Sequence, residues 1–469
     1  MVAVTLVAYL VVLILIGIWA QRRVGDTSDF HLAGRRMGPI VASLSASASS
    51  SSAWTLLGVS GAAYAWGLQA LWLIPAIWSG FFINWVFIAP KLQPASHENG
   101  ALTLVEFLGR GSDAANEQRI RAFGAAIILF CFTFYVASQF QAAGTAIATA
   151  LTVDTAVAIL AGAAIVIAYV FLGGFWAASV TDALQGLMML FVAAVLPVVA
   201  LVAVGGPAEL QSGLRALEDP SLMRVVDQPG LLLSMVFIAG LFGIGLGYPG
   251  QPHVVNRFMA LRSSCEIRFA RSIALSWAAV IYVGMVVLGW CGRVLMPELP
   301  DGESVLLELA VDLLPAVLGG LVTGGVLAAI MSTSDSQLLV AGSAVSHDLR
   351  RGNGSLMLDR VVILLLGVAA VVLALWFPDS IFDRVLFAWQ ALGNAFGPLL
   401  IVLLFSGGVR SRYRLAAMLT GFSLTVLISI YPGQAPGNAI ERLLPFAIAL
   451  VIALAGRVRA GKTPDTART

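Results

Sequence analysis

The chain has 469 residues, of which 59% are hydrophobic and only 11% carry a charge. A soluble globular domain has about 25% charged residues, so this composition excludes an ordinary water-soluble protein and indicates a chain built for a lipid bilayer. The net charge of +2 does not indicate a protein that binds nucleic acid. The scattered cysteines and histidines, and the lack of any Walker, zinc or dinucleotide motif in the sequence, predict neither an enzyme nor an ATP-driven pump.

Thirteen apolar segments are long enough to cross a bilayer, for which about 20 residues are needed. They lie near 2–20, 38–63, 69–91, 122–150, 155–172, 180–204, 230–256, 272–292, 311–346, 359–377, 385–406, 415–431 and 443–457. Basic residues follow the first segment instead of preceding it, which predicts an uncleaved span with its N-terminus outside. The polar stretches 96–119 and 205–229 are expected to form short surface helices.

The distribution of basic residues supports this topology. With an external N-terminus, all but five of the 27 lysines and arginines fall on the cytoplasmic side, as the positive-inside rule requires. The five exceptions are Arg215, Arg224, Arg293, Arg384 and Arg442. The external loop near 298–308 is acidic instead. We therefore expect a cytoplasmic C-terminus and count Arg257 among the cytoplasmic basic residues.

Two apolar segments are interrupted by residues that weaken a helix. Residues 45–54 read SASASSSSAW, and residues 243–252 read GIGLGYPGQP. Irregular backbone at membrane depth is tolerated only where it is buried or lines a cavity, so the two breaks mark a candidate binding site. They lie five spans apart, which predicts inverted repeats at 38–204 and 230–407, with 2–20 and 415–457 as additional spans. The alternative is a pair of kinks that serve close helix packing.

Two acidic residues lie within apolar stretches, where ionisable groups are costly and usually functional. Asp182 stands at the start of the sixth span and Asp335 lies within the ninth. Because no lysine or arginine is near either residue in the sequence, we expect each to be paired with a bound cation, a proton or backbone amides. A helix cap is the alternative for Asp182.

The ninth span also carries an oxygen-rich face. Ala329, Ser332, Thr333 and Ser336 recur at i, i+3, i+4 and i+7, and Asp335 borders the stripe. These hydroxyls, with carbonyls freed by a helix break, could form a dehydrated cage for sodium, a hard cation that prefers oxygen. The alternative is that the hydroxyls only bond back to their own helix.

At these residues the sequence resembles the sodium/solute symporter family, and most closely its bacterial sodium/proline branch. The similarity runs through nearly the whole chain. Its strongest stretches are 171–175 (FLGGF) with Thr181-Asp182, 245–248 (GLGY), 250–253 (GQPH), 257–260 (RFMA), 327–333 (LAAIMST) and 336–339 (SQLL), with a weaker match at 101–104 (ALTL). The resemblance implies an all-α, LeuT-like five-plus-five inverted repeat, located in a bacterial inner membrane.

The resemblance also implies site residues, carried over by position. The main sodium site would use the carbonyls of Ala48, Ser51 and Ala329 and the hydroxyls of Ser332 and Thr333. A second cation site would use Asp182, Ser332, Thr333, Asp335 and Ser336. The solute pocket would draw on Ser52, Trp54, Tyr135, Ile244, Tyr248 and Pro252.

This chain departs from the known proline carriers of that branch at four positions. They have Asp at the position of Ser50, Gly at that of Ala53, Trp at that of Ile244 and Ser at that of Asp335. One acid is lost and one is gained, which suggests that the cation moves while the site charge is kept. Ile244 replaces a flat aromatic wall by a smaller aliphatic one.

The expected function is sodium-coupled import of a small solute such as proline, by alternating access. Sodium is the expected coupling ion, and the solute, sodium and the bilayer are the expected partners. Two alternatives stay open: a proton-coupled symporter that uses Asp182 and Asp335, and a membrane protein that senses a solute.

Overall fold

The computed structural model describes residues 11, 12, 15, 32–217, 219–350, 355–377, 380–431 and 435–458, apart from the side chains of residues 169, 172 and 173. The first predicted span, 2–20, lies almost entirely outside these residues. The described part is helical, and its β contacts are two isolated bridges, Met37 with Leu261 and Val409 with Arg457.

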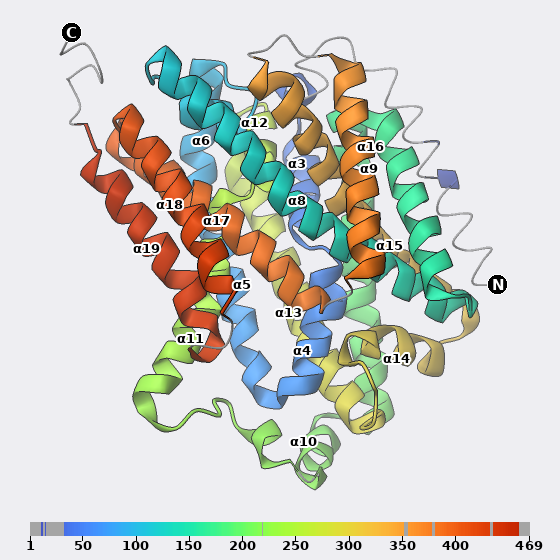
Figure 1. Ribbon diagram of the computed structural model, residues 1–469. Helices are drawn as coiled ribbons and strands as arrows, with labels where there is room; N and C mark the ends of the chain where they lie inside the picture. Colours follow the sequence, from blue (N-terminus) through green and yellow to red (C-terminus); the bar gives the residue numbers. More distant parts are fainter. Residues whose placement is uncertain are drawn as a thin grey trace.

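The helices follow one another along the chain with short connections (Figure 1). They are α3 (Pro39–Ser50), α4 (Val59–Trp66), α5 (Leu73–Phe82), α6 (Ala89–Asn99), α7 (Leu104–Gly109), α8 (Ala114–Leu151), α9 (Thr155–Val204), α10 (Pro207–Ala216), α11 (Gly230–Leu246), α12 (Pro252–Ala260), α13 (Ile267–Leu295), α14 (Val305–Leu313), α15 (Ala316–Ser343), α16 (Leu356–Trp376), α17 (Ile381–Ser406), α18 (Ser411–Ser429) and α19 (Ala439–Ala455).

Every predicted span from 38–63 onward contains helix, and nine stretches of the described chain are long and apolar enough to cross a membrane. The total of thirteen spans stays a prediction. The spans 155–172 and 180–204 both fall in α9, which is kinked at Gly174, whose positive φ of 67° suits a residue without Cβ. The first residues of 311–346 belong to the separate helix α14. The stretch 205–229 carries the short, largely exposed helix α10, as predicted. The stretch 96–119 carries the short helix α7, which is buried and not on the surface as expected.

Both predicted interruptions are present. The first broken helix ends as α3 at Ser50, passes through the non-helical Ser51, and resumes as a π-helical turn at Trp54–Gly58. The second ends as α11 at Leu246, makes a short 3₁₀ turn at Tyr248–Gly250, and restarts as α12 at Pro252. Proline is well placed there because the first residue of a helix needs no amide donor.

Helix α15 runs through the interior of the bundle. Every residue from Val322 to Ser343 is buried, and the helix contacts α9, α8, α16 and α3. A helix buried on all sides is shielded from lipid as well as from water, so its polar residues can be retained only where other helices supply partners. The candidate residues Ser332, Thr333 and Asp335 all lie in this enclosed stretch.

The segments predicted to face opposite sides of the membrane lie at opposite ends of the bundle (Figure 1). Helices α10 and α14, which border the predicted external loops, lie at one end. The far ends of α6 and α12 lie at the other, where Met37 bridges to Leu261.

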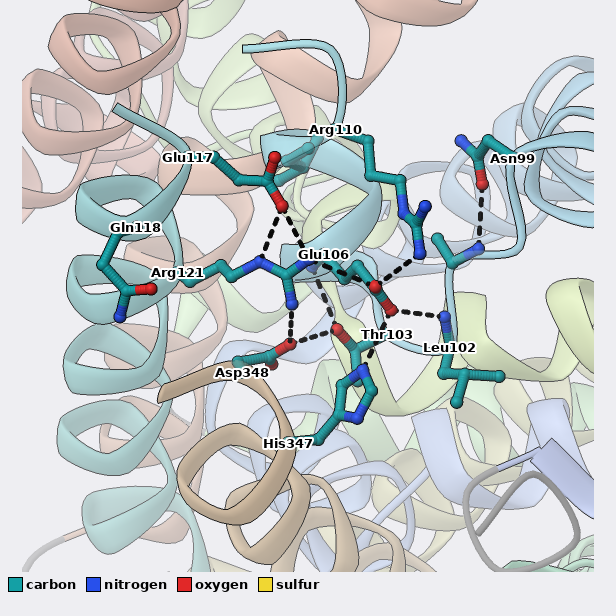
Figure 2. A network of polar contacts seen from close by, with 12 residues as sticks. Asn99, Leu102, Thr103, Glu106, Arg110, Glu117, Gln118, Arg121, His347 and Asp348 are labelled. Carbon is teal, nitrogen blue, oxygen red and sulfur yellow. Dashed lines mark hydrogen bonds and ion pairs between the residues drawn. The ribbon is translucent and has the colours of Figure 1, made fainter. Parts of the chain in front are cut away.

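A polar cluster, buried except for Arg110, joins α7, α8 and the π-helical turn Ala344–Leu349 that follows α15 (Figure 2). Its members are Thr103, Glu106, Arg110, Arg121, His347 and Asp348. One oxygen of Glu106 accepts from Arg110 at 2.7 Å and Arg121 at 3.1 Å. The other accepts from the Leu102 amide at 2.8 Å and contacts the His347 ring at 3.0 Å.

The pKa of Glu106 reports how strongly this cluster holds its carboxylate. Burial by itself would raise that pKa, but the hydrogen bonds from His347 and the Leu102 amide, with the charge of Arg121, lower it well below the ordinary value of 4.5. A lowered folded-state pKa means that the ionised carboxylate stabilises the fold at neutral pH, and that this contribution disappears only on strong acidification.

We predict that Glu106→Gln lowers the free energy of unfolding by about 3 kcal/mol at pH 7, because it removes an ionised acceptor from the buried Arg121 and the partner of the exposed Arg110. Thermal unfolding in detergent should show this loss at neutral pH, with a smaller gap between variant and parent below about pH 4. Glu98→Gln, an exposed glutamate at the same end of the molecule, is the matched control. Equal melting temperatures for both variants would refute the structural role of the cluster.

Candidate functional site

The first helix break lies against α15 through a set of converging oxygens. The Ser332 hydroxyl lies 3.3 Å from the Ala48 carbonyl and 3.1 Å from the Ala329 carbonyl. The Thr333 hydroxyl donates to the Ser49 carbonyl at 3.2 Å. The structure thus brings together four members of the predicted main sodium site, and it adds the Ser49 carbonyl, which was not predicted.

This set of ligands suits sodium because all of its members are neutral oxygens. The helix breaks at this point, so no following helical amide donates a hydrogen bond to the last carbonyls. The bond from Ser332 to Ala329 is the back-bond foreseen as the alternative, yet the same hydroxyl also reaches across to the broken helix. Ser51, the fifth predicted ligand, is the non-helical residue itself, with φ −121° and ψ 80°.

Other helices support the broken backbone around this point. The amide of Ala53 donates to Gln139 Oε1 of α8 at 3.0 Å. The Tyr282 hydroxyl of α13 lies 3.3 Å from both the Ser51 and the Thr55 hydroxyls. Neither Gln139 nor Tyr282 was predicted, because each stands alone on a long helix and the sequence gives no sign of which residue faces the break.

A central pocket lies beside the same break. Its lining comprises Ser50, Trp54, Tyr135, Ile244, Tyr248, Val385, Leu386 and Trp389. Four of the six predicted solute residues therefore line it. Ser52 lies behind the wall, where its hydroxyl accepts from Tyr135 at 3.4 Å and from the Trp54 amide at 3.2 Å. Pro252 begins α12 and is not part of the lining.

The pocket wall at Ile244 has an aromatic residue that the sequence did not indicate. Trp389 of α17 donates its ring N–H to the Ile244 carbonyl at 3.1 Å. Its ring meets Tyr248 edge to face, with the centroids 4.6 Å apart. A flat aromatic surface is therefore present next to Ile244, although it comes from another helix. Nothing in the apolar run around Trp389 distinguished it from a packing residue.

The structure corrects the expectation for Asp182. This residue is fully buried within α9 and is not a helix cap. Its partner is Arg257, whose guanidinium Nη2 lies 2.9 Å from Asp182 Oδ2. Arg257 is itself fully buried in α12 and does not lie in a solvated loop. The sequence concealed this pair because its members are 75 residues apart, on different helices.

Asp335 and Ser336 lie next to this ion pair. The Ser336 hydroxyl lies 2.5 Å from Arg257 Nη2 and 3.0 Å from both Asp335 Oδ1 and the Ser49 hydroxyl. Of the predicted second cation site, Asp182, Asp335 and Ser336 are therefore brought together, but an arginine lies among them. Ser332 and Thr333 face the first break instead.

A second cavity of about 480 Å³ opens beside the central pocket, at the end where α14 lies. It is lined in part by Asp301, Glu303 and Asp383. Phe382 lines this outer cavity and packs against Trp54 in a tilted arrangement, with the ring centroids 5.6 Å apart. Trp54 and Phe382 thus separate the outer cavity from the central pocket, which encloses only about 10 Å³, the space for one water molecule.

A solute cavity between two broken helices at mid-bundle is the arrangement by which secondary transporters hold their cargo, and this is the class that the fold and the pocket define. Residues 30–421 match the model of the sodium:solute symporter family, so the chain belongs to that family. It is accordingly a multi-pass membrane protein and a symporter that couples a small solute to sodium.

Curated relatives agree over nearly the full chain. The osmoregulated proline transporter OpuE of Bacillus subtilis is 32% identical, with 95% of this chain and 92% of the relative covered. The high-affinity proline transporter PutP of the same organism is 33% identical, with 94% and 96% covered. The sodium/proline symporter of Escherichia coli is 34% identical, with 91% and 87% covered.

Solved structures confirm the predicted fold. A sodium-coupled sialic acid symporter in a substrate-bound outward-open state superposes with a TM-score of 0.81 at 17% identity, covering 97% of each chain. Mhp1, a nucleobase-cation-symport-1 family transporter in a closed conformation with bromovinylhydantoin bound, superposes with a TM-score of 0.58 at 13% identity, covering 92% of this chain and 95% of Mhp1. At these identities the likeness concerns the fold alone.

The separating residue Phe382 is held by Glu303, whose carboxylate accepts from the amides of Ile381 and Phe382 at 3.0 and 2.8 Å. We predict that Glu303→Ala lowers the free energy of unfolding by about 1–2 kcal/mol, the usual cost of losing a helix cap. Thermal unfolding in detergent measures this, with the exposed Glu298→Ala on the same loop as the control. If both variants melt like the parent, Glu303 does not anchor α17.

Proposed function

We propose that this symporter imports proline or a similar small neutral amino acid, with one face of the first helix break holding sodium and the other face holding the solute. The observation that carries this proposal is that residues 48–54 supply both sets of contacts. Ala48 and Ser49 present carbonyls to Ser332 and Thr333, while Ser50 and Trp54 line the pocket.

This shared segment offers a physical basis for coupling. The hydroxyls of Ser332 and Thr333 on α15 donate to the carbonyls of the break. Sodium would accept electron density from the hydroxyl and carbonyl oxygens alike, and so would draw α15 and the break together. An ion can favour solute binding only by stabilising the backbone conformation that the solute also requires, and residues 48–54 are common to both.

The chemistry of the pocket favours a solute without net charge. None of its eight lining residues carries a charge, and Trp54, Tyr135, Tyr248 and Trp389 present aromatic surface. A solute with a charged side chain would have to leave water without a compensating partner there. The names of the relatives are consistent with this chemistry, since all three are proline transporters. Because the pocket now encloses so little space, Trp54 and Phe382 must move apart to admit a solute.

We further propose that the chain lies in a bacterial inner membrane, with the end that carries α10 and α14 outside and the C-terminus in the cytoplasm. The charge asymmetry of the loops supports this orientation. No catalytic step is proposed, because binding and release of intact cargo account for the site. The two repeats proposed for 38–204 and 230–407 would place the breaks at equivalent positions.

Proton coupling is the second candidate function, because the buried Asp335 has one carboxylate oxygen with no hydrogen bond among the described residues. Uptake into proteoliposomes with a sodium gradient and no pH gradient separates the two. Accumulation of proline under a sodium gradient supports the main proposal. Accumulation that needs a pH gradient, and is indifferent to sodium, supports proton coupling and overturns the main proposal.

For the sodium site, we predict that Ser332→Ala and Thr333→Ala each raise the sodium concentration for half-maximal proline uptake by about tenfold, equivalent to about 1.4 kcal/mol. Each change removes one oxygen ligand and leaves the helix intact. Ser334→Ala, a buried serine on the same helix that does not reach the break, is the control and should leave this concentration unchanged. A normal sodium dependence in the first two variants would rule out the proposed site.

For the solute pocket, we predict that Trp389→Leu weakens proline binding at saturating sodium by about tenfold, because the aromatic wall and the bond to the Ile244 carbonyl are lost together. Equilibrium binding of radiolabelled proline to purified protein measures the change. Trp376→Leu, at the exposed end of α16, is the control. Unchanged binding in Trp389→Leu would remove this residue from the pocket.

A further inference from the structure

Trp54 carries a buried polar atom that the protein itself does not satisfy. Its side chain is 4% exposed, and its indole N–H has no hydrogen-bond partner among the described residues. An indole N–H can only donate, and a buried donor without a partner is costly, so the partner that it lacks is an acceptor. Trp54 lines the central pocket, and the carboxylate of an amino acid bound there is such an acceptor.

Aromatic residues on four different elements border this pocket. They are Trp54 on the π-helical turn after the first break, Tyr135 on α8, Tyr248 on the 3₁₀ turn of the second break and Trp389 on α17. Because they come from separate elements, they present rings to the solute from more than one direction. Aromatic rings placed in this way attract a cation, and such cages are the sites that recognise quaternary ammonium groups.

The polar atoms of three of these residues are engaged by other protein groups. The Tyr135 hydroxyl donates to the Ser52 hydroxyl at 3.4 Å, and the Tyr248 hydroxyl lies 3.5 Å from the Tyr282 hydroxyl. The ring N–H of Trp389 donates to a backbone carbonyl at 3.1 Å. What these three residues offer to a solute is therefore mainly the carbon surface of their rings.

The rest of the lining provides no carboxylate that could accept hydrogen bonds from an ammonium group. It consists of Ser50, Ile244, Val385 and Leu386. The Ser50 hydroxyl donates to the Ser47 carbonyl at 3.0 Å, which leaves its oxygen as a neutral acceptor. A nitrogen with N–H groups loses its hydrogen bonds to water on entering such a site and recovers few of them. A nitrogen that carries only carbon substituents has no N–H group to desolvate, so it enters the same site at a lower cost.

We propose that the central pocket recognises N-methylated amino acids of the betaine type, with aromatic rings around the quaternary nitrogen and the Trp54 N–H on the carboxylate. This inference rests on the proposed sodium-coupled function and specifies the class of solute for the same pocket. Such compounds are zwitterions without net charge, which matches the uncharged lining. The relevant probe is N,N-dimethylproline, which keeps the ring and carboxylate of proline and replaces both N–H groups by methyl groups.

The experiment compares proline, N-methylproline and N,N-dimethylproline as competitors of radiolabelled proline on the purified wild-type protein at saturating sodium. Each methyl group removes one N–H donor from the same ring. We expect the inhibition constant to fall along the series, to about one tenth of the proline value for the dimethyl compound, because the cation gains aromatic contact at a lower desolvation cost. Cyclopentanecarboxylate, which keeps the ring and the carboxylate but lacks the cation, is the matched control and should compete about 30-fold more weakly than N,N-dimethylproline.

Two variants test the two halves of the recognition separately. Ser50→Asp adds a carboxylate to the lining and should reverse the order of the series, so that proline becomes the stronger competitor. Trp54→Phe keeps an aromatic ring but removes the N–H, so it should weaken proline and N,N-dimethylproline alike by about tenfold. A Trp54→Phe variant that binds both compounds like the parent contradicts the role of the N–H, and an unreversed order in Ser50→Asp contradicts the role of the missing carboxylate.

The wild-type series decides the inference even if neither variant folds. If N,N-dimethylproline competes no better than proline, or if cyclopentanecarboxylate competes as well as either, the pocket is not a site for a methylated ammonium group. Direct binding of radiolabelled proline with and without sodium is measured on the same preparation. Absence of any sodium effect there refutes the proposed function, whereas sodium-dependent proline binding with weak competition by N,N-dimethylproline refutes only the solute class.

Discussion

The structure depends on one constraint: a helix that is broken inside a bilayer must have its freed backbone groups satisfied by other helices. At Ser51 the chain leaves the helical conformation, and the surrounding elements supply the partners. Gln139 receives the Ala53 amide, while Ser332 and Thr333 donate to the carbonyls that precede the break. Helices α8 and α15 are therefore fixed against α3 by the same interactions that create the site, so the break is both the weakest part of the helix and the centre of the polar packing.

Sequence patterns were sufficient for features that depend on local chemistry. Serine-rich and glycine/proline-rich interruptions marked both breaks, and the hydroxyl stripe of α15 marked the face that meets the first one. The sequence could not reveal pairings between distant helices. Arg257 looked like a cytoplasmic loop residue because it follows an apolar run and precedes other arginines. The structure shows instead that α12 begins at Pro252 and holds Arg257 inside the bundle. Trp389 was hidden for a related reason, since a tryptophan in an apolar segment has the same local pattern whether it faces lipid or a pocket.

Two of the differences from the known proline carriers have different consequences for the site in the folded structure. Ile244 removes an aromatic ring from one wall, but Trp389 bonds to its carbonyl and restores aromatic surface beside it. Ser50 removes an acid from the pocket lining, and Asp335 adds a buried one beside Ser336. The first change keeps the character of the pocket, whereas the second transfers negative charge from the solute side of the break to the side that faces Arg257.

The carboxylates around the outer cavity give the entrance a chemistry of its own. Asp301, Glu303 and Asp383 border the same space of about 480 Å³ above Trp54 and Phe382. Such a concave acidic surface enriches small cations from the surrounding medium, and the enrichment falls as the total salt shortens the Debye length from about 30 Å at 0.01 M to about 10 Å at 0.1 M. The rate at which sodium arrives thus depends on the whole electrolyte. In dilute media the acidic entrance concentrates sodium near the site. In concentrated potassium salts it concentrates potassium instead.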